Sequence, residues 1–132
     1  EQAKHLMEQQ RSWLVDADIL LITLMGVATI EEIDALAREL IAILDQHPQK
    51  ISIIFETSQV HSFPRELRRI GQIWKPYYQH PHLMWTTMVT SNTMHYYFAS
   101  VASRISRGKW RNHRTIEESL HFIHAQNTYY KS

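Results

Sequence analysis

One stretch near the start constrains the fold most: an apolar run over residues 19–30, broken only by Thr23, Gly26 and Thr29. It is shorter than the roughly 20 residues that cross a bilayer. It ends in the tetrad Thr29-Ile30-Glu31-Glu32, a capping box. In such a box the threonine hydroxyl accepts the amide hydrogen of Glu32, whose carboxylate reaches back to the Thr29 amide. A buried strand followed at once by a capped helix predicts an α/β fold.

The rest of the chain continues this alternation of strands and helices. We expect a hairpin of strands 11–15 and 19–25, then strands at 51–56, 83–90 and 109–113. Helices are expected from Thr29 to His47, from Pro64 to a stop between Pro76 and Pro81, from Ser91 or Asn92 to Gly108, and from Thr115 to Gln126. Apolar residues recur at helical spacing in each, and the polar segment 57–63 is typical of a loop. The order predicts a mixed, mostly parallel five-stranded sheet with an N-terminal hairpin and four helices.

Length and composition favour one cytoplasmic domain. The 132 residues suit a single domain, which we place at 11–126, with an N-terminal extension at 1–10 and a tail at 127–132. The chain contains no cysteine, which excludes disulfides, thiolate nucleophiles and cysteine-bound zinc. Absence of cysteine suits the cytosol.

Charge is distributed unevenly although the net charge is only +1. Residues 67–116 contain eight Lys or Arg and no Asp or Glu. Such a basic stretch either faces solvent or forms a surface for an anionic partner. An acidic protein, a second copy of the chain or an anionic lipid surface fits better than nucleic acid, for which no motif is present. The candidate residues are Arg104, Arg107, Lys109, Arg111 and Arg114, joined by Arg68 and Arg69.

Four segments resemble the STAS-like superfamily typified by the bacterial anti-sigma-factor antagonists: ILLITLMGVATIEEIDAL (19–36), ISIIFETSQVHSF (51–63), LMWTTMVTSN (83–92) and TIEESLHFI (115–123). The resemblance implies singly wound β-α units with helices mainly on one side of the sheet. The antagonists place a phosphorylated serine at the start of the second helix. Pro64-Arg65-Glu66 occupy that place here, so the kinase-regulated role is not implied. What the resemblance implies is noncatalytic recognition of proteins, nucleotides or lipids.

Candidate catalytic and metal-binding groups have simpler interpretations. His121 and His124 stand three residues apart on the last helix, as metal ligands can, but a solvated helix flank is the favoured interpretation. His80 and His82 lie in a loop without a carboxylate beside them. The paired glutamates fall in first helical turns, where negative charge complements the helix dipole. No phosphate-binding glycine loop or GxSxG turn is present, so we expect no enzyme, metal or cofactor.

A polar pocket is the remaining possibility for a site in the sheet. Ligands of open α/β sheets bind at the carboxyl ends of strands. Glu56, at the end of a predicted central strand, could line such a pocket with Arg65, Glu66 and Asn92. Strand-end charges that simply reach water are the alternative interpretation.

Two functions therefore stay open. The first is a noncatalytic binding or regulatory module that recognises a protein or anionic partner. The second is a carrier of lipid or another small apolar ligand. A closed pocket lined by methionine and aromatic side chains would favour the carrier, and a filled core with an exposed basic face would favour the module.

Overall fold

The computed structural model describes residues 7–14, 18–93, 104–105 and 108–131, with side chains up to Asn127. The five strands form one sheet in the order β1-β2-β3-β4-β5. β1 pairs antiparallel to β2, and the other pairs are parallel. The mixed sheet and its opening hairpin are confirmed. The elements are β1 (Glu8–Leu14), β2 (Ile19–Val27), α1 (Ile30–Gln46), β3 (Ile51–Ser62), α2 (Leu67–Tyr78), β4 (Leu83–Val89), β5 (Trp110–His113) and α4 (Ile116–Lys131).

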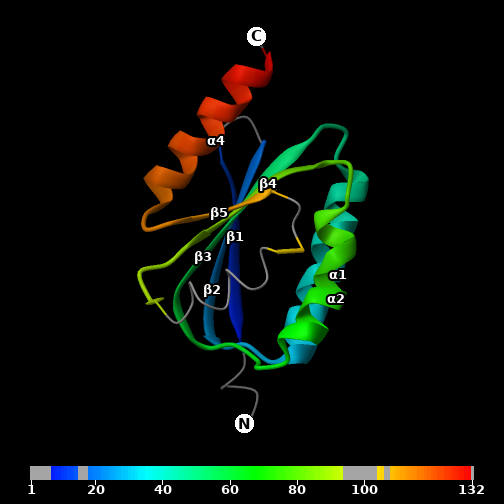
Figure 1. Ribbon diagram of the computed structural model, residues 1–132, viewed down its shortest axis with the longest axis vertical. Coiled ribbons are helices and arrows are strands. Elements are labelled where there is room, and N and C mark those ends of the chain that lie inside the picture. Colours follow the sequence, from blue (N-terminus) through cyan, green and yellow to red (C-terminus); the bar gives the residue numbers. More distant parts are fainter. Residues whose placement is uncertain (1–6, 15–17, 94–103, 106–107, 132) are drawn as a thin grey trace.

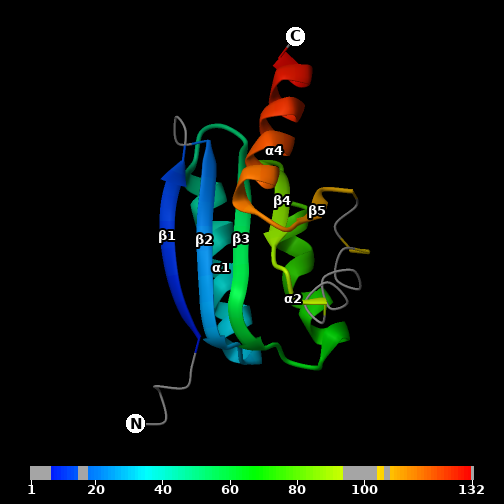
Figure 2. The same ribbon diagram turned by 90° about the vertical axis from the view of Figure 1, so that its left-hand side faces the viewer.

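Helices cover both faces of the sheet. α1 and α2 lie side by side on one face, and α4 lies on the other (Figures 1 and 2). Strand β3 is therefore covered on both sides, which explains why every residue from Ile51 to Phe55, including Ser52, is buried. Ile53 packs in the larger core beneath α1 and α2, whereas its neighbour Ile54 packs with Ile123 of α4.

The first helix forms as its capping box predicts. Thr29 Oγ1 accepts a hydrogen bond from the Glu32 amide at 3.2 Å, and Glu32 Oε1 accepts one from the Thr29 amide at 3.1 Å. The second carboxylate oxygen of Glu32 accepts the Met7 amide at 2.9 Å. This contact joins the segment before β1 to the start of α1, so one side chain organises two parts of the chain.

Three element bounds differ from the sequence prediction at their ends. β1 begins at Glu8, inside the expected extension. α2 begins at Leu67 instead of Pro64, and it ends at Tyr78, between Pro76 and Pro81 as predicted. Proline in the last turn forfeits only one helical hydrogen bond while Tyr77 and Tyr78 become buried. α4 continues past Gln126 to Lys131, where a tail was expected. No proline or glycine stops it there.

The largest difference is in β3, which extends to Ser62 where a loop was expected. Its second half pairs with the end of β2, including Gly26 with Val60. Gly26 has a φ of 93°, which only glycine adopts easily, and it lies at a register shift in β2 instead of after the strand. The helix expected between Asn92 and Gly108 lies largely outside the described residues.

Candidate functional site

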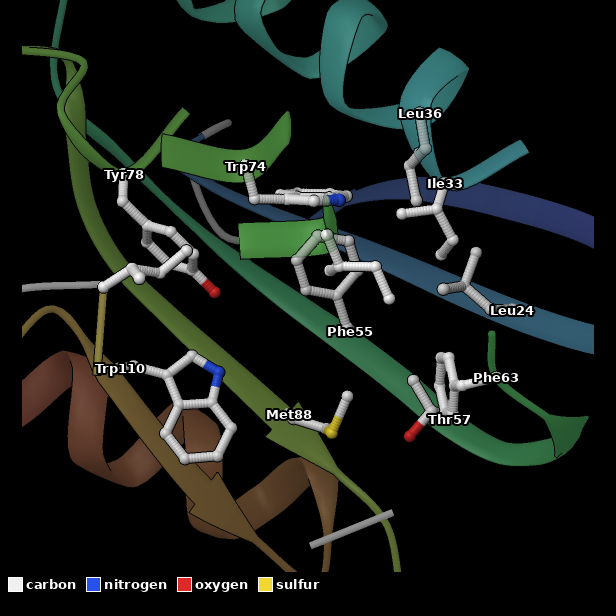
Figure 3. Close-up of a pocket in the computed structure, with 12 residues that line it drawn as sticks. Leu24, Ile33, Leu36, Phe55, Thr57, Phe63, Trp74, Tyr78, Met88 and Trp110 are labelled. Carbon is white, nitrogen blue, oxygen red and sulfur yellow. The ribbon is translucent and has the colours of Figure 1, made fainter. Parts of the chain in front are cut away.

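An apolar cavity of about 70 Å³ lies between the sheet and the pair α1 and α2. Its walls come from six elements: β2, β3, β4 and β5 of the sheet beneath, and α1 and α2 above, with Phe63 and Ile105 beside them. Phe55, Trp74, Tyr78, Met88 and Trp110 point toward one space (Figure 3). The cavity is not fully enclosed by its lining.

Packed aromatic rings hold one wall of the cavity in place. The Phe55 and Trp74 ring centroids lie 5.8 Å apart with the planes at 81°. Trp74 contacts Tyr77 in a similar edge-to-face arrangement at 4.9 Å. This geometry is favourable for aromatic pairs, so the wall is preformed.

The two adjacent tyrosines of α2 face different surroundings. The Tyr77 hydroxyl is hydrogen-bonded to Thr86 Oγ1 at 2.8 Å and does not line the cavity. Tyr78 lines it. Burial raises the pKa of both phenols above their ordinary value of 10, because a phenolate would lose its hydration. Both hydroxyls therefore keep their protons at neutral pH.

The structure divides the predicted basic surface. Arg68 and Arg69 are exposed in the first turn of α2. Arg104 is exposed, and its neighbour Ile105 lies 3.8 Å from the point where a Cβ on Gly71 would be. Residues 104–105 therefore pack against α2, on the side of the sheet opposite α4. Arg107 lies outside the described residues.

The remaining basic residues lie within β5 or directly beside it. Arg111 lies over the Trp85 and Phe122 rings, 4.9 and 5.3 Å from their centroids, on the α4 side. It also donates to the Trp110 carbonyl at 2.7 Å, so it has a structural contact besides its exposure. Arg114 is exposed. Burial first, and then the charge of nearby Lys50, lowers the pKa of Lys109.

The proposed strand-end pocket is not at a strand end. Glu56 lies in the middle of β3, since the strand continues to Ser62. Its carboxylate accepts hydrogen bonds from the Ser58 amide at 3.2 Å and hydroxyl at 2.7 Å. Arg65 and Glu66 are exposed before α2, and Glu66 makes no side-chain cap there. Asn92 is exposed after β4, where its amide donates to Thr90 Oγ1 at 3.1 Å.

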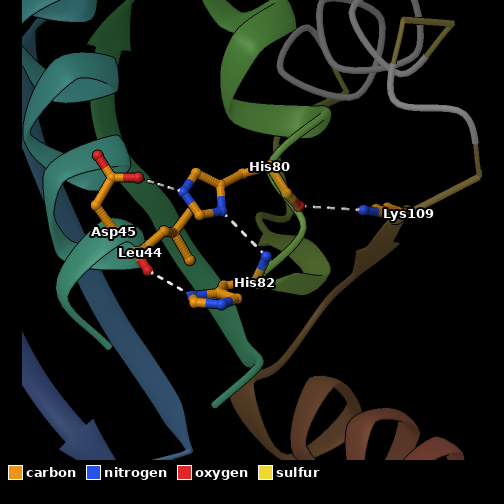
Figure 4. Close-up of polar contacts among 5 residues, drawn as sticks. All are labelled: Leu44, Asp45, His80, His82 and Lys109. Carbon is orange, nitrogen blue, oxygen red and sulfur yellow. Dashed lines mark hydrogen bonds and ion pairs between the residues drawn. The ribbon is translucent and has the colours of Figure 1, made fainter. Parts of the chain in front are cut away.

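The histidine loop between α2 and β4 is held by α1 and by the residue before β5 (Figure 4). His80 Nε2 lies 2.7 Å from Asp45 Oδ1, and His82 Nδ1 bonds the Leu44 carbonyl at 2.8 Å. Lys109 Nζ donates to the His80 carbonyl at 3.5 Å. Asp45 is a carboxylate beside this loop that the sequence did not indicate. Over the described ranges, no three His, Asp or Glu side chains gather as a metal site, and His121 and His124 are both exposed on α4.

The sequence did not identify Tyr78, Met88 and Trp110 as neighbours around one space. Tyr78 is four residues after Trp74 and eight after Ile70, so the helical spacing that marks the inward side of α2 could have identified it. Trp110 could not be assigned because the side of the sheet it faces depends on β5 pairing with β4.

Together, a hairpin edge, three parallel pairings and helices on the faces define an α/β domain with a STAS-like, or SpoIIAA-like, fold. The crystal structure of an uncharacterized protein from the DUF3478 family of Shewanella loihica PV-4, described as having a SpoIIAA-like fold, superposes with a TM-score of 0.65. The match covers 89% of this chain and 94% of that one at 11% sequence identity. It confirms the predicted fold.

Sequence comparison adds no functional assignment. No protein-family model matches the chain, and no curated protein is significantly similar to it. Among the described helices, none combines the length and apolarity needed to cross a bilayer.

Proposed function

We propose that this protein is a noncatalytic binding module that holds a small apolar molecule in the cavity beneath α1 and α2. The observation that carries the proposal is the lining of that cavity, which combines Met88 with aromatic side chains from α2, β3 and β5. Such walls are typical of small-molecule sites. The cavity has about half the volume of one of about 150 Å³ that takes up benzene. A ring therefore enters only in part, and the remainder of the ligand lies in the open side.

Titration with ethylbenzene, followed by methyl NMR, tests this proposal. We expect the methyl resonances of Leu24, Ile33 and Met88, which line the cavity, to shift in a saturable manner. The methyl resonances of Ile123, in the core beneath α4, should hardly move. Equal shifts in both cores, or none at saturating ligand, would refute the proposal.

Two matched variants of β2 locate the ligand. Leu24→Phe adds a ring inside the cavity, whereas Leu21→Phe makes the same change on the α4 side, where Leu21 packs with the other core. We expect Leu24→Phe to weaken ethylbenzene binding at least tenfold and Leu21→Phe to leave it unchanged. Equal weakening by both variants would contradict a ligand in this cavity.

An anion-binding role remains a second candidate, supported by the packing of residues 104–105 against α2. This packing places the exposed Arg104 near α2, the helix whose first turn contains Arg68 and Arg69. Binding to anionic vesicles or polyglutamate should weaken as salt rises. Reversal of Arg68 and Arg104 to Glu should abolish it, and the double reversal of exposed Lys50 and Lys75 should not. Arg111 is less useful as a test because its substitution also removes the ring contacts.

A further inference from the structure

Within the apolar cavity the Tyr78 hydroxyl is a polar group without a hydrogen-bond partner among the described residues. The side chain is 8% exposed, and its hydroxyl is directed toward the space enclosed by the lining (Figure 3). No hydrogen bond within the described residues involves Tyr78 Oη. The adjacent Tyr77, which is fully buried, has its hydroxyl bonded to Thr86. One tyrosine is satisfied by the fold, and the other has a hydrogen-bonding group available for a ligand.

The polar groups in the cavity lining are mainly hydrogen-bond donors, and few acceptors are available. A tyrosine hydroxyl that keeps its proton can donate, and the indole N–H groups of Trp74 and Trp110 are donors only. Thr57 also lines the cavity, but it gives its proton to the Val89 carbonyl at 3.3 Å. A ligand with a hydrogen-bond acceptor therefore complements this lining better than a pure hydrocarbon does.

Charge on the ligand is excluded by the same lining. Among the described residues that form the cavity, none carries a charged side chain. An anion or cation buried there would lose its hydration without gaining a partner of opposite charge. The part of the ligand inside the cavity must therefore be neutral.

We propose that the cavity binds an uncharged aromatic or alicyclic molecule that bears a carbonyl oxygen, with the Tyr78 hydroxyl donating its hydrogen bond to that oxygen. This inference rests on the proposed function, because it assigns the chemical class of ligand to the same cavity. The ring packs against the aromatic wall formed by Phe55 and Trp74. The carbonyl oxygen meets the Tyr78 hydroxyl, which no described residue pairs.

Acetophenone and ethylbenzene form a matched pair of probes, because acetophenone has a carbonyl group where ethylbenzene has a methylene group. Dissociation constants for both are measured by NMR with the wild-type protein, Tyr78→Phe and Tyr77→Phe. A neutral hydrogen bond contributes enough to change affinity about fivefold. We expect Tyr78→Phe to reduce the preference for acetophenone over ethylbenzene by about that factor. Tyr77→Phe, the same chemical change one residue away and outside the cavity, should leave the preference unchanged.

The outcomes separate this inference from the proposed function. If neither probe binds the wild-type protein, the proposed function fails. If both bind and Tyr78→Phe leaves their ratio unchanged, the cavity binds apolar molecules but the hydrogen bond is refuted. If Tyr77→Phe reduces the preference for acetophenone as much as Tyr78→Phe does, the effect comes from the packing of α2, and the hydrogen bond from Tyr78 is again refuted.

A measurement on the wild-type chain keeps the test independent of how the variants fold. With ¹³Cζ-labelled tyrosine, acetophenone should shift the Tyr78 resonance more than ethylbenzene does at equal saturation. The Tyr77 resonance should respond little to either probe. Equal responses of Tyr78 to the two probes would overturn the assignment.

Discussion

The hydrogen bond between Tyr77 and Thr86 joins α2 to the centre of the sheet, and its removal has a calculable cost. Tyr77→Phe keeps the ring contacts and deletes only the hydroxyl. Thr86, which is 1% exposed, is then left with a buried hydroxyl that has lost its partner. Such a group costs about 1–3 kcal/mol, so we expect Tyr77→Phe to lower the free energy of unfolding by about 2 kcal/mol. Thr86→Val should cost a similar amount by orphaning the tyrosine.

Urea unfolding of the two single variants and the double variant measures this coupling. The double variant leaves neither hydroxyl buried and unpaired, so we expect it to cost about 1 kcal/mol, well below the sum of the singles. With a slope of about 2 kcal/mol per molar urea, each single variant should lower the unfolding midpoint by about 1 M. Additive losses would show that the two hydroxyls do not interact, and the burial argument for this contact would then be wrong.

Three further predictions concern other parts of the fold. Thr87 is fully buried, and no described group pairs with its hydroxyl. We therefore expect Thr87→Val to raise the free energy of unfolding, measured in urea, by about 1 kcal/mol; a decrease would contradict an unpaired hydroxyl. Thr29→Ala should cost about 1 kcal/mol, and a midpoint shift worth only a few tenths would contradict its capping role. The pKa of His113 is lowered from 6.5, chiefly by burial, so the folded state takes up a proton here less readily than the unfolded state does. Protons therefore bind the unfolded state preferentially, and the free energy of unfolding should fall as pH drops below about 6.5. His113→Gln should make this fall with pH less steep, and an unchanged pH dependence would rule out a contribution from His113.

Local signals were sufficient to predict most of the fold. The capping box at Thr29 and the spacing of Ile33, Leu36 and Leu40 depend only on near neighbours in the chain, and these residues are buried as predicted. The second half of β3 could not be predicted in this way. Its polar residues break the alternation that marks a strand, and it is held by pairing with the irregular end of β2. Register shifts of that kind depend on contacts between distant parts of the chain.

The candidate cavity was harder to predict than the fold because it depends on how the strands align. Ile70, Trp74 and Tyr77 recur at the helical spacing that predicts this helix, and all three are buried. Trp85 and Trp110 could not be assigned to a face. Register between β4 and β5 places them on opposite sides, Trp110 at the cavity and Trp85 against Phe122 of α4. The two tryptophans therefore could not be assigned to the cavity or to the α4 side without the strand register.

The cavity also has an energetic cost, which bears on its interpretation. At about 24 cal/mol per Å³, an empty volume of about 70 Å³ lowers stability by about 1.7 kcal/mol. The same kind of molecule reduces this cost and meets the Tyr78 hydroxyl, because a neutral ring fills the volume and a carbonyl oxygen accepts the hydrogen bond. A domain stable by about 5–15 kcal/mol can carry this cost without a ligand. The preformed aromatic wall then lets binding proceed with little rearrangement, which is the property a reversible small-molecule site needs.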